Sequence, residues 1–148
     1  MSIRYQHLEP IRATPERVFA AIDDLPLTSK WLPPCVSLEK IGDGPNAVGD
    51  KLSYVYKQGG KTGNMAGEIM ARTDGKRLHC KYFDSMFDVS VDLHVAASPE
   101  GSMTTHIIEI TPKKLIAKLM SPLIRFGLGK QTREAAENLR KMLESPAV

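Results

Sequence analysis

Hydrophobic and polar residues alternate along the middle of the chain, most clearly between Phe87 and Val95, where every second side chain is apolar. Such alternation is typical of strands with one buried face and one solvated face. Because the intervening turns are short and rich in Gly, Asp and Asn, we expect neighbouring strands to pair antiparallel. The predicted strands cover residues 35–41, 50–58, 62–72, 76–84, 87–97 and 102–111.

The N-terminal part of the chain has a different pattern. Residues 3–9 are predicted to form a short strand. Thr14, Pro15 and Glu16 then mark a helix start, because threonine can cap, proline fits the first turn and glutamate faces the positive end of the helix dipole. A second short helix is expected over residues 27–32, where a pair of prolines ends it. Two short helices should therefore follow the first strand.

The C-terminal run has helical periodicity and predicts a long helix over residues 113–144 with one face buried. Its apolar residues recur three and four apart: Leu115, Ile116, Leu119, Met120, Leu123, Ile124, Ala135, Ala136, Leu139, Met142 and Leu143. Pro122 should kink this helix, and Gly127 and Gly129 should weaken it. One kinked helix is the preferred prediction, in which the two glycines admit a close backbone contact, and a break into two helices at these glycines is the alternative.

The order of elements predicts an α+β domain that spans residues 1–148. A twisted antiparallel sheet of about seven strands should curl around the long C-terminal helix. Curling leaves a space between sheet and helix, and a small apolar ligand would occupy it.

Charge and cysteine content exclude several classes of protein. The net charge of +3 comes without a dense Lys/Arg stripe, so no nucleic-acid partner is expected. The chain has neither an apolar leader segment nor an apolar run of about 18 residues, and a cytoplasmic location is expected. Cys35 and Cys80 lack CxxC spacing, and no histidine pair has the spacing of metal ligands. We therefore expect no disulfide scaffold, no metal and no cofactor.

Three local patterns resemble a known family. They are residues 11–19 followed by Asp24 and Trp31, the turn at residues 47–52, and the closing segment 118–143. They are similar to the opening strand-to-helix passage, a turn and the final helix of the SRPBCC superfamily. This superfamily includes START lipid-transfer domains, birch-pollen-allergen-like proteins and polyketide cyclase/dehydrase-like proteins. The resemblance implies a helix-grip fold, but several activities share that scaffold.

Strand alternation places three tyrosines and one histidine on the predicted inner face. Tyr54 and Tyr56 share one strand, Tyr82 lies on another, and His106 lies on the last. His106 should face inward because the opposite face of its strand carries Glu109, which is costly to bury unpaired. A phenol or imidazole in an apolar pocket can fix a ligand oxygen, and a histidine can move a proton. Alternatively, these side chains simply pack, with their polar ends reaching the backbone or the sheet rim.

The predicted ligand-lining set joins these residues to apolar neighbours, and Trp31 is included because related proteins often place a residue of this region at the pocket mouth. The set consists of Trp31, Tyr54, Tyr56, Tyr82, His106, Ile108, Leu119 and Leu123. His106 is also the candidate catalytic residue. The preferred hypothesis is a carrier or sensor of a small hydrophobic ligand such as a lipid, isoprenoid or polyketide-like aromatic, because no acid/base pair converges. The alternatives are a polyketide cyclase or dehydratase that uses His106 or a cavity tyrosine, and a protein-interaction module.

Basic residues accompany the apolar positions at the start of the closing helix. They are Lys113, Lys114, Lys118 and Arg125. A basic amphipathic helix would suit transient contact with an anionic membrane surface. The charged outer face of an ordinary helix gives the same pattern.

Overall fold

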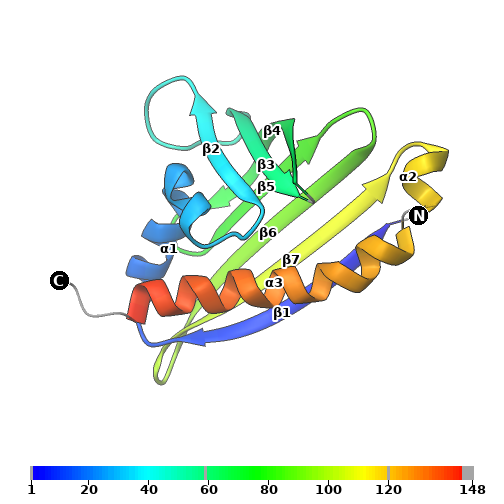
Figure 1. The fold of residues 1–148 in the computed structure, drawn as a ribbon. Helices are drawn as coiled ribbons and strands as arrows, with labels where there is room; N and C mark the ends of the chain where they lie inside the picture. Colours follow the sequence, from blue (N-terminus) through cyan, green and yellow to red (C-terminus); the bar gives the residue numbers. More distant parts are fainter. Residues whose placement is uncertain (1, 59, 120, 145–148) are drawn as a thin grey trace.

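The computed structural model describes residues 2–58, 60–119 and 121–144, and in this part of the chain seven strands form one antiparallel sheet. The order across the sheet is β1-β7-β6-β5-β4-β3-β2, so the first strand pairs with the last. The strands are β1 (Ile3–Ile11), β2 (Cys35–Ile41), β3 (Lys51–Gln58), β4 (Lys61–Thr73), β5 (Arg77–Phe83), β6 (Phe87–Ser98) and β7 (Gly101–Pro112). All the predicted strands are confirmed, and the sheet curves around a long helix (Figure 1).

Two short helices close one end of the curved sheet, as predicted (Figure 1). Helix α1 (Pro15–Asp23) begins after Thr14, whose side-chain oxygen accepts a hydrogen bond from the backbone N–H of Arg17. The second element, η1 (Leu25–Lys30), is a 3-10 helix that begins two residues before the predicted 27–32. It has a proline in its first turn, where the missing N–H removes no internal hydrogen bond, so the earlier start is tolerated.

The closing segment contains two described helical stretches, and the break expected at Gly127 and Gly129 is wrong, because both glycines lie inside the second stretch. The chain forms α2 (Leu115–Leu119) and α3 (Ser121–Glu144), and Met120 between them lies outside the described residues. Pro122 is the second residue of α3.

The apolar face predicted for the closing segment is wrong for α2. Leu115, Ile116 and Leu119 are 73%, 67% and 73% exposed, whereas Ala117 is buried. Figure 1 shows the reason: α2 lies at the end of the sheet away from α1, beyond the part that α3 covers. The predicted burial holds for the C-terminal half of α3, where the buried residues are Ala135, Ala136, Leu139 and Leu143.

Helix α3 is fixed to strand β1 by close packing and by ionic contacts. A Cβ at position 129 would lie 3.0 Å from the Tyr5 ring, so Gly129 allows the helix to approach that ring closely. The Tyr5 hydroxyl accepts a hydrogen bond from Arg133 at 3.1 Å. Further along, the Arg140 guanidinium donates to Glu9 at 2.7 Å. These contacts hold α3 across the concave face of the sheet, as the helix-grip prediction requires.

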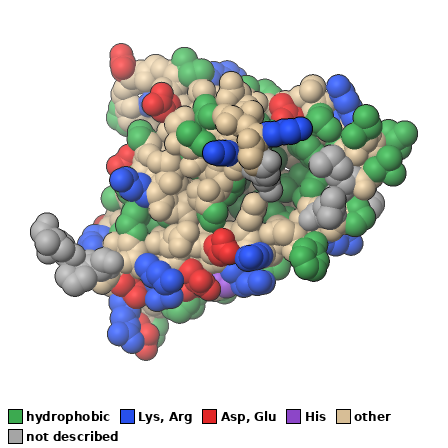
Figure 2. Space-filling view, viewed as in Figure 1, with side chains coloured by type: hydrophobic (Ala, Val, Ile, Leu, Met, Phe, Trp, Pro, Cys, Tyr) green, Lys and Arg blue, Asp and Glu red, His purple; other side chains and the backbone are tan. Residues whose placement is uncertain are grey.

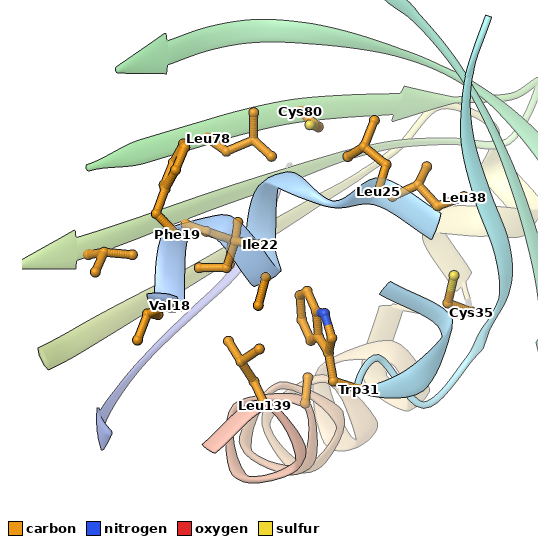
Figure 3. Close-up of a cluster of buried hydrophobic side chains, with 14 of the residues drawn as sticks. Val18, Phe19, Ile22, Leu25, Trp31, Cys35, Leu38, Leu78, Cys80 and Leu139 are labelled. Carbon is orange, nitrogen blue, oxygen red and sulfur yellow. The ribbon is translucent and has the colours of Figure 1, made fainter. Parts of the chain in front are cut away.

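The apolar core is concentrated at the end of the sheet closed by α1 and η1. Figure 3 shows Phe19 and Ile22 of α1 beside Leu78 of β5. Trp31, directly after η1, stands between this group and Leu139 of α3. The core therefore joins sheet, short helices and long helix at one end of the molecule.

Candidate ligand-binding site

The strand register brings the predicted inner-face residues onto one face of the sheet. Leu93 of β6 pairs with Leu78 on one side and with His106 on the other. Four residues further along β5 and β6, Tyr82 pairs with Val89. Because side chains two residues apart point to the same face, these side chains share the concave face that α3 crosses.

Three tyrosines form a connected aromatic cluster on this face. The ring centroids of Tyr54 and Tyr56 are 5.8 Å apart in a stacked arrangement, and those of Tyr54 and Tyr82 are 5.0 Å apart with tilted planes. Such separations are typical of favourable aromatic pairs. The cluster is thus a preformed apolar wall with hydroxyl groups at its edges.

Two glycines of β4 make room for these rings, and the sequence analysis did not assign them to the site. Gly63 lies opposite Tyr56 in the sheet, and a Cβ there would come 2.5 Å from the Tyr56 ring. Gly67 lies opposite Tyr82, and a Cβ there would come 2.7 Å from that ring. Glycine inside a strand often marks a close approach, so the four-residue spacing of these glycines was the available signal.

Burial makes ionisation of two phenols and two thiols near this wall still less favourable than in water. It raises the pKa of Tyr54 and of Tyr82 above the ordinary value for a phenol. It also raises the pKa of the Cys35 thiol to about 11 and that of the Cys80 thiol to about 12. Both cysteines are free and buried. The wall therefore offers hydroxyl groups for hydrogen bonds but no charge.

Trp31 and His106 form a second aromatic contact on the inner side of the sheet. Their ring centroids are 6.3 Å apart with planes at 78°, and the two residues are 3% and 2% exposed. Within the described part of the chain, neither Trp31 Nε1 nor His106 Nε2 has a hydrogen-bond partner. Burial lowers the pKa of His106 to about 4, so its imidazole is neutral at pH 7.

The packing of the concave face changes at His106. Thr104 and His106 of β7 and Leu93 of β6 are buried, on the side of α1. Two residues further along each strand, away from α1, Ile108 of β7 and Val91 of β6 are partly exposed. Figure 2 shows a hollow in the molecular surface on this side, next to the first turns of α3. The concave face is thus closed at one end and open at the other.

The predicted ligand-lining residues fall into three groups in the structure. Tyr54, Tyr56 and Ile108 are partly exposed on the concave face. Tyr82, Trp31 and His106 are buried, so Trp31 lies within the core and not at an exposed rim. Leu119 projects into solvent because α2 lies beyond the packed part of the fold, and the side chain of Leu123 lies outside the described residues.

Other kinds of site were sought among the described residues. No group of three or more His, Cys, Asp or Glu side chains there is arranged to hold a metal ion. Of the described helices, none has the length and hydropathy needed to cross a bilayer. The polar groups described on the concave face include the phenols, the imidazole of His106, the indole of Trp31 and, on β1, the Glu9 carboxylate that pairs with Arg140.

The sequence was compared with models of protein families and with curated proteins. A family model for "Polyketide cyclase / dehydrase and lipid transport" matches residues 3–144. No curated protein matches the sequence.

Several solved structures share the arrangement of sheet and helices. The di-domain ARO/CYC StfQ from the steffimycin biosynthetic pathway aligns with a TM-score of 0.79 at 9% identity, over 97% of this chain and 51% of that chain. TTHA0849 from Thermus thermophilus aligns with a TM-score of 0.72 at 18% identity, over 97% of each chain. Ara h 8.0201 aligns with a TM-score of 0.63 at 17% identity, over 94% of this chain and 98% of that chain. At such low identity these structures confirm the predicted helix-grip fold and carry no activity across.

Proposed function

The chain belongs to the polyketide cyclase/dehydrase and lipid transport family, and from this premise we propose that it binds a small hydrophobic ligand between the concave sheet face and α3. The ligand classes that fit are a lipid, an isoprenoid or a polyketide-like aromatic. The protein would act as a carrier or sensor of this molecule.

The observation that carries the proposal is the partly exposed apolar surface on the inner face of the sheet. Beyond His106, the concave positions of β6 and β7 are apolar and partly exposed; they are Phe87, Val89, Val91, Ile108 and Ile110. Covering apolar surface gains about 25 cal/mol per Å². A ligand in the hollow would supply this cover, and the tyrosine hydroxyls would orient its polar groups.

The protonation of the site favours binding over catalysis. A proton-transfer residue works best when its pKa is near the working pH. Burial holds the pKa of His106 near 4, so at pH 7 this residue has no acidic proton to give and is a weak base. Burial also raises the pKa of Tyr54 and Tyr82, so neither phenol ionises easily. These shifts support a carrier or sensor over a cyclase or dehydratase.

Native mass spectrometry of the protein purified from its own cells tests ligand binding. We expect a retained apolar ligand, released by organic solvent. Ile108→Trp would fill the open part of the concave face and should expel the ligand, whereas Ile107→Trp on the opposite face of β7 should retain it. Finding no ligand in any of the three proteins would contradict the proposal.

The enzyme alternative has its own test. Wild-type protein and His106→Gln are incubated with a linear poly-β-ketone, and the products are followed by chromatography. If the protein is a carrier, the poly-β-ketone should react no faster with the protein than without it. Wild-type turnover that falls by about 10²–10⁴ in His106→Gln would instead assign proton transfer to this residue.

Contact with a membrane surface during ligand loading is the second part of the proposal. Leu115, Ile116 and Leu119 of α2 are exposed, and Phe126 in the first part of α3 is 91% exposed. Large apolar side chains gathered on one surface commonly mark a contact with a partner or a membrane. α2 and the first part of α3 lie beside the hollow (Figure 2). Binding of this surface to a membrane would therefore place the opening of the hollow at the lipid surface.

The charge around this apolar surface favours an anionic lipid as its partner. No Asp or Glu occurs between residues 110 and 133 of the sequence. Lys113 is 2.9 Å from Asp88, but no carboxylate of the described residues pairs with Lys114, Lys118 or Arg125. Basic residues beside exposed apolar side chains attract a helix to an anionic bilayer. Co-sedimentation with vesicles tests this contact.

A further inference from the structure

The strongest unexplained feature of the interior is the pair of buried nitrogens without partners among the described residues, Trp31 Nε1 and His106 Nε2. An unpartnered buried polar group is destabilising, and buried donors and acceptors are nearly always paired. Here two such groups belong to rings in edge-to-face contact. These two nitrogens are therefore polar groups of the interior that a bound molecule could satisfy.

The position of this pair is suited to a ligand. His106 is the last fully buried residue of the concave face before Ile108, which is partly exposed toward the hollow. The backbone of Trp31 is fixed to α3, because its carbonyl oxygen accepts a hydrogen bond from the Asn138 side chain at 3.1 Å. Figure 3 shows the indole nitrogen on the edge of the ring turned away from Leu139 and toward the side of Cys35. The pair therefore lies in the buried part of the concave face, next to the partly exposed positions that a ligand would cover.

We propose that Trp31 and His106 form a polar subsite, at the closed end of the concave face, that holds an uncharged oxygen of the ligand, a ketone or a hydroxyl group. This inference rests on the ligand binding proposed above. The indole N–H donates a hydrogen bond, and the neutral imidazole nitrogen donates or accepts according to its tautomer. A carbonyl or hydroxyl oxygen can satisfy such a pair. A pure hydrocarbon would leave both nitrogens unpaired.

The surroundings select an uncharged oxygen over a carboxylate. Both rings belong to a buried region with Leu93, Leu139 and other apolar side chains. Burying a carboxylate without a positive partner is far more costly than burying a neutral oxygen. His106 remains neutral at pH 7 and does not supply that charge. The subsite therefore discriminates by hydrogen bonding, as buried polar groups in specific pockets do.

A matched pair of probes tests the subsite. 2-Acetylnaphthalene and 2-isopropenylnaphthalene have nearly the same shape and differ in a ketone oxygen against a methylene group. We expect the wild-type protein to bind the ketone about three to ten times more tightly, the gain expected for one hydrogen bond. Affinities are measured by isothermal titration calorimetry.

The sequence contains one tryptophan, so the indole N–H of Trp31 gives a single cross-peak in a ¹⁵N–¹H spectrum. The ketone should shift this peak downfield, because the proton gains a hydrogen bond, and the alkene should not. This readout uses the unmodified protein and does not depend on the folding of any variant.

Three variants locate the preference. Trp31→Phe removes the indole N–H, His106→Phe removes the imidazole nitrogens, and each should reduce the ketone preference. His94→Gln, which removes an imidazole on the opposite face of the sheet, should retain it. Equal binding of the two probes with an unshifted indole peak would overturn the subsite while leaving ligand binding intact, and would assign the two nitrogens to a buried water. Failure of both probes to bind would count against the proposed function and the subsite together.

Discussion

The ring of Tyr82 on β5 lies directly against Gly67 on β4, so that a Cβ at position 67 would come 2.7 Å from the Cδ1 atom of the ring. A Cβ there would also come 3.1 Å from the Cβ of Leu52 on the other neighbouring strand. Tyr82 is buried and packs against Tyr54, so its ring has little freedom to move aside. The absence of a side chain at Gly67 therefore allows the Tyr82 ring to occupy this position.

Gly67→Ala should destabilise the protein. Overpacking of this kind typically costs about 1–3 kcal/mol, which lowers the melting temperature by about 2–4 °C for each kcal/mol in a chain of this size. Thermal unfolding followed by circular dichroism measures the change. An unaltered melting temperature would mean that the Tyr82 ring can move aside without cost.

Gly127→Ala is the matched control and should have the opposite effect. Gly127 lies inside α3, and a Cβ there would meet no atom within 4 Å among the described residues. Alanine is favoured over glycine in a helix, so we expect a gain of about 0.4–1 kcal/mol in the free energy of unfolding. Urea unfolding measures this gain. A loss of stability would show that the side chain meets something in the hollow.

Stability should fall as the pH falls from about 6.5 toward 4, because of His106. Burial, with a smaller effect of His7, lowers the pKa of His106 from 6.5 to about 4 in the folded state. Between these values the unfolded chain binds a proton that the folded chain does not, which favours unfolding. Urea unfolding at pH 7.5 and pH 5 should therefore show lower stability at the acidic pH.

His106→Gln should weaken this pH dependence. An NMR titration of wild-type His106 gives the same information without a substitution. A pKa near 6.5 would place this imidazole in contact with solvent and contradict both the burial and the proposed subsite.

Binding to anionic vesicles should depend on both the apolar and the basic side chains around α2. We expect co-sedimentation with phosphatidylserine/phosphatidylcholine vesicles, weaker binding to pure phosphatidylcholine, and further weakening at high salt, because surface charge attraction is screened. Leu119→Ser combined with Phe126→Ser should reduce binding, and Lys118→Glu should reduce it for the anionic vesicles in particular.

A control substitution of the same kind on another exposed surface, Ile41→Ser, should leave vesicle binding unchanged. Equal sedimentation with both vesicle types, or no loss in the Leu119/Phe126 variant, would contradict membrane docking. In that case the exposed apolar side chains would fit the interaction-module hypothesis better.

Local sequence patterns were sufficient to place the strands and to assign the faces of their side chains. β2 (Cys35–Ile41) has the predicted limits, and Tyr54 and Tyr56 share one face as expected. Both results depend on local properties, since alternation along one strand and the residues of its turns are contained in a few consecutive positions. The element order then predicted the sheet wrapped around a C-terminal helix, and the structure confirms it.

Which of these side chains are covered depends on the three-dimensional packing and could not be predicted from local patterns. Leu119 has the helical spacing of a core residue and yet projects into solvent, because α2 lies beyond the part of the sheet that α3 covers. The contacts of Gly67 with Tyr82 and of Trp31 with His106 join residues far apart in sequence. Periodicity determines the side toward which a residue points. The extent of the neighbouring elements determines whether another side chain, solvent or a ligand meets it there.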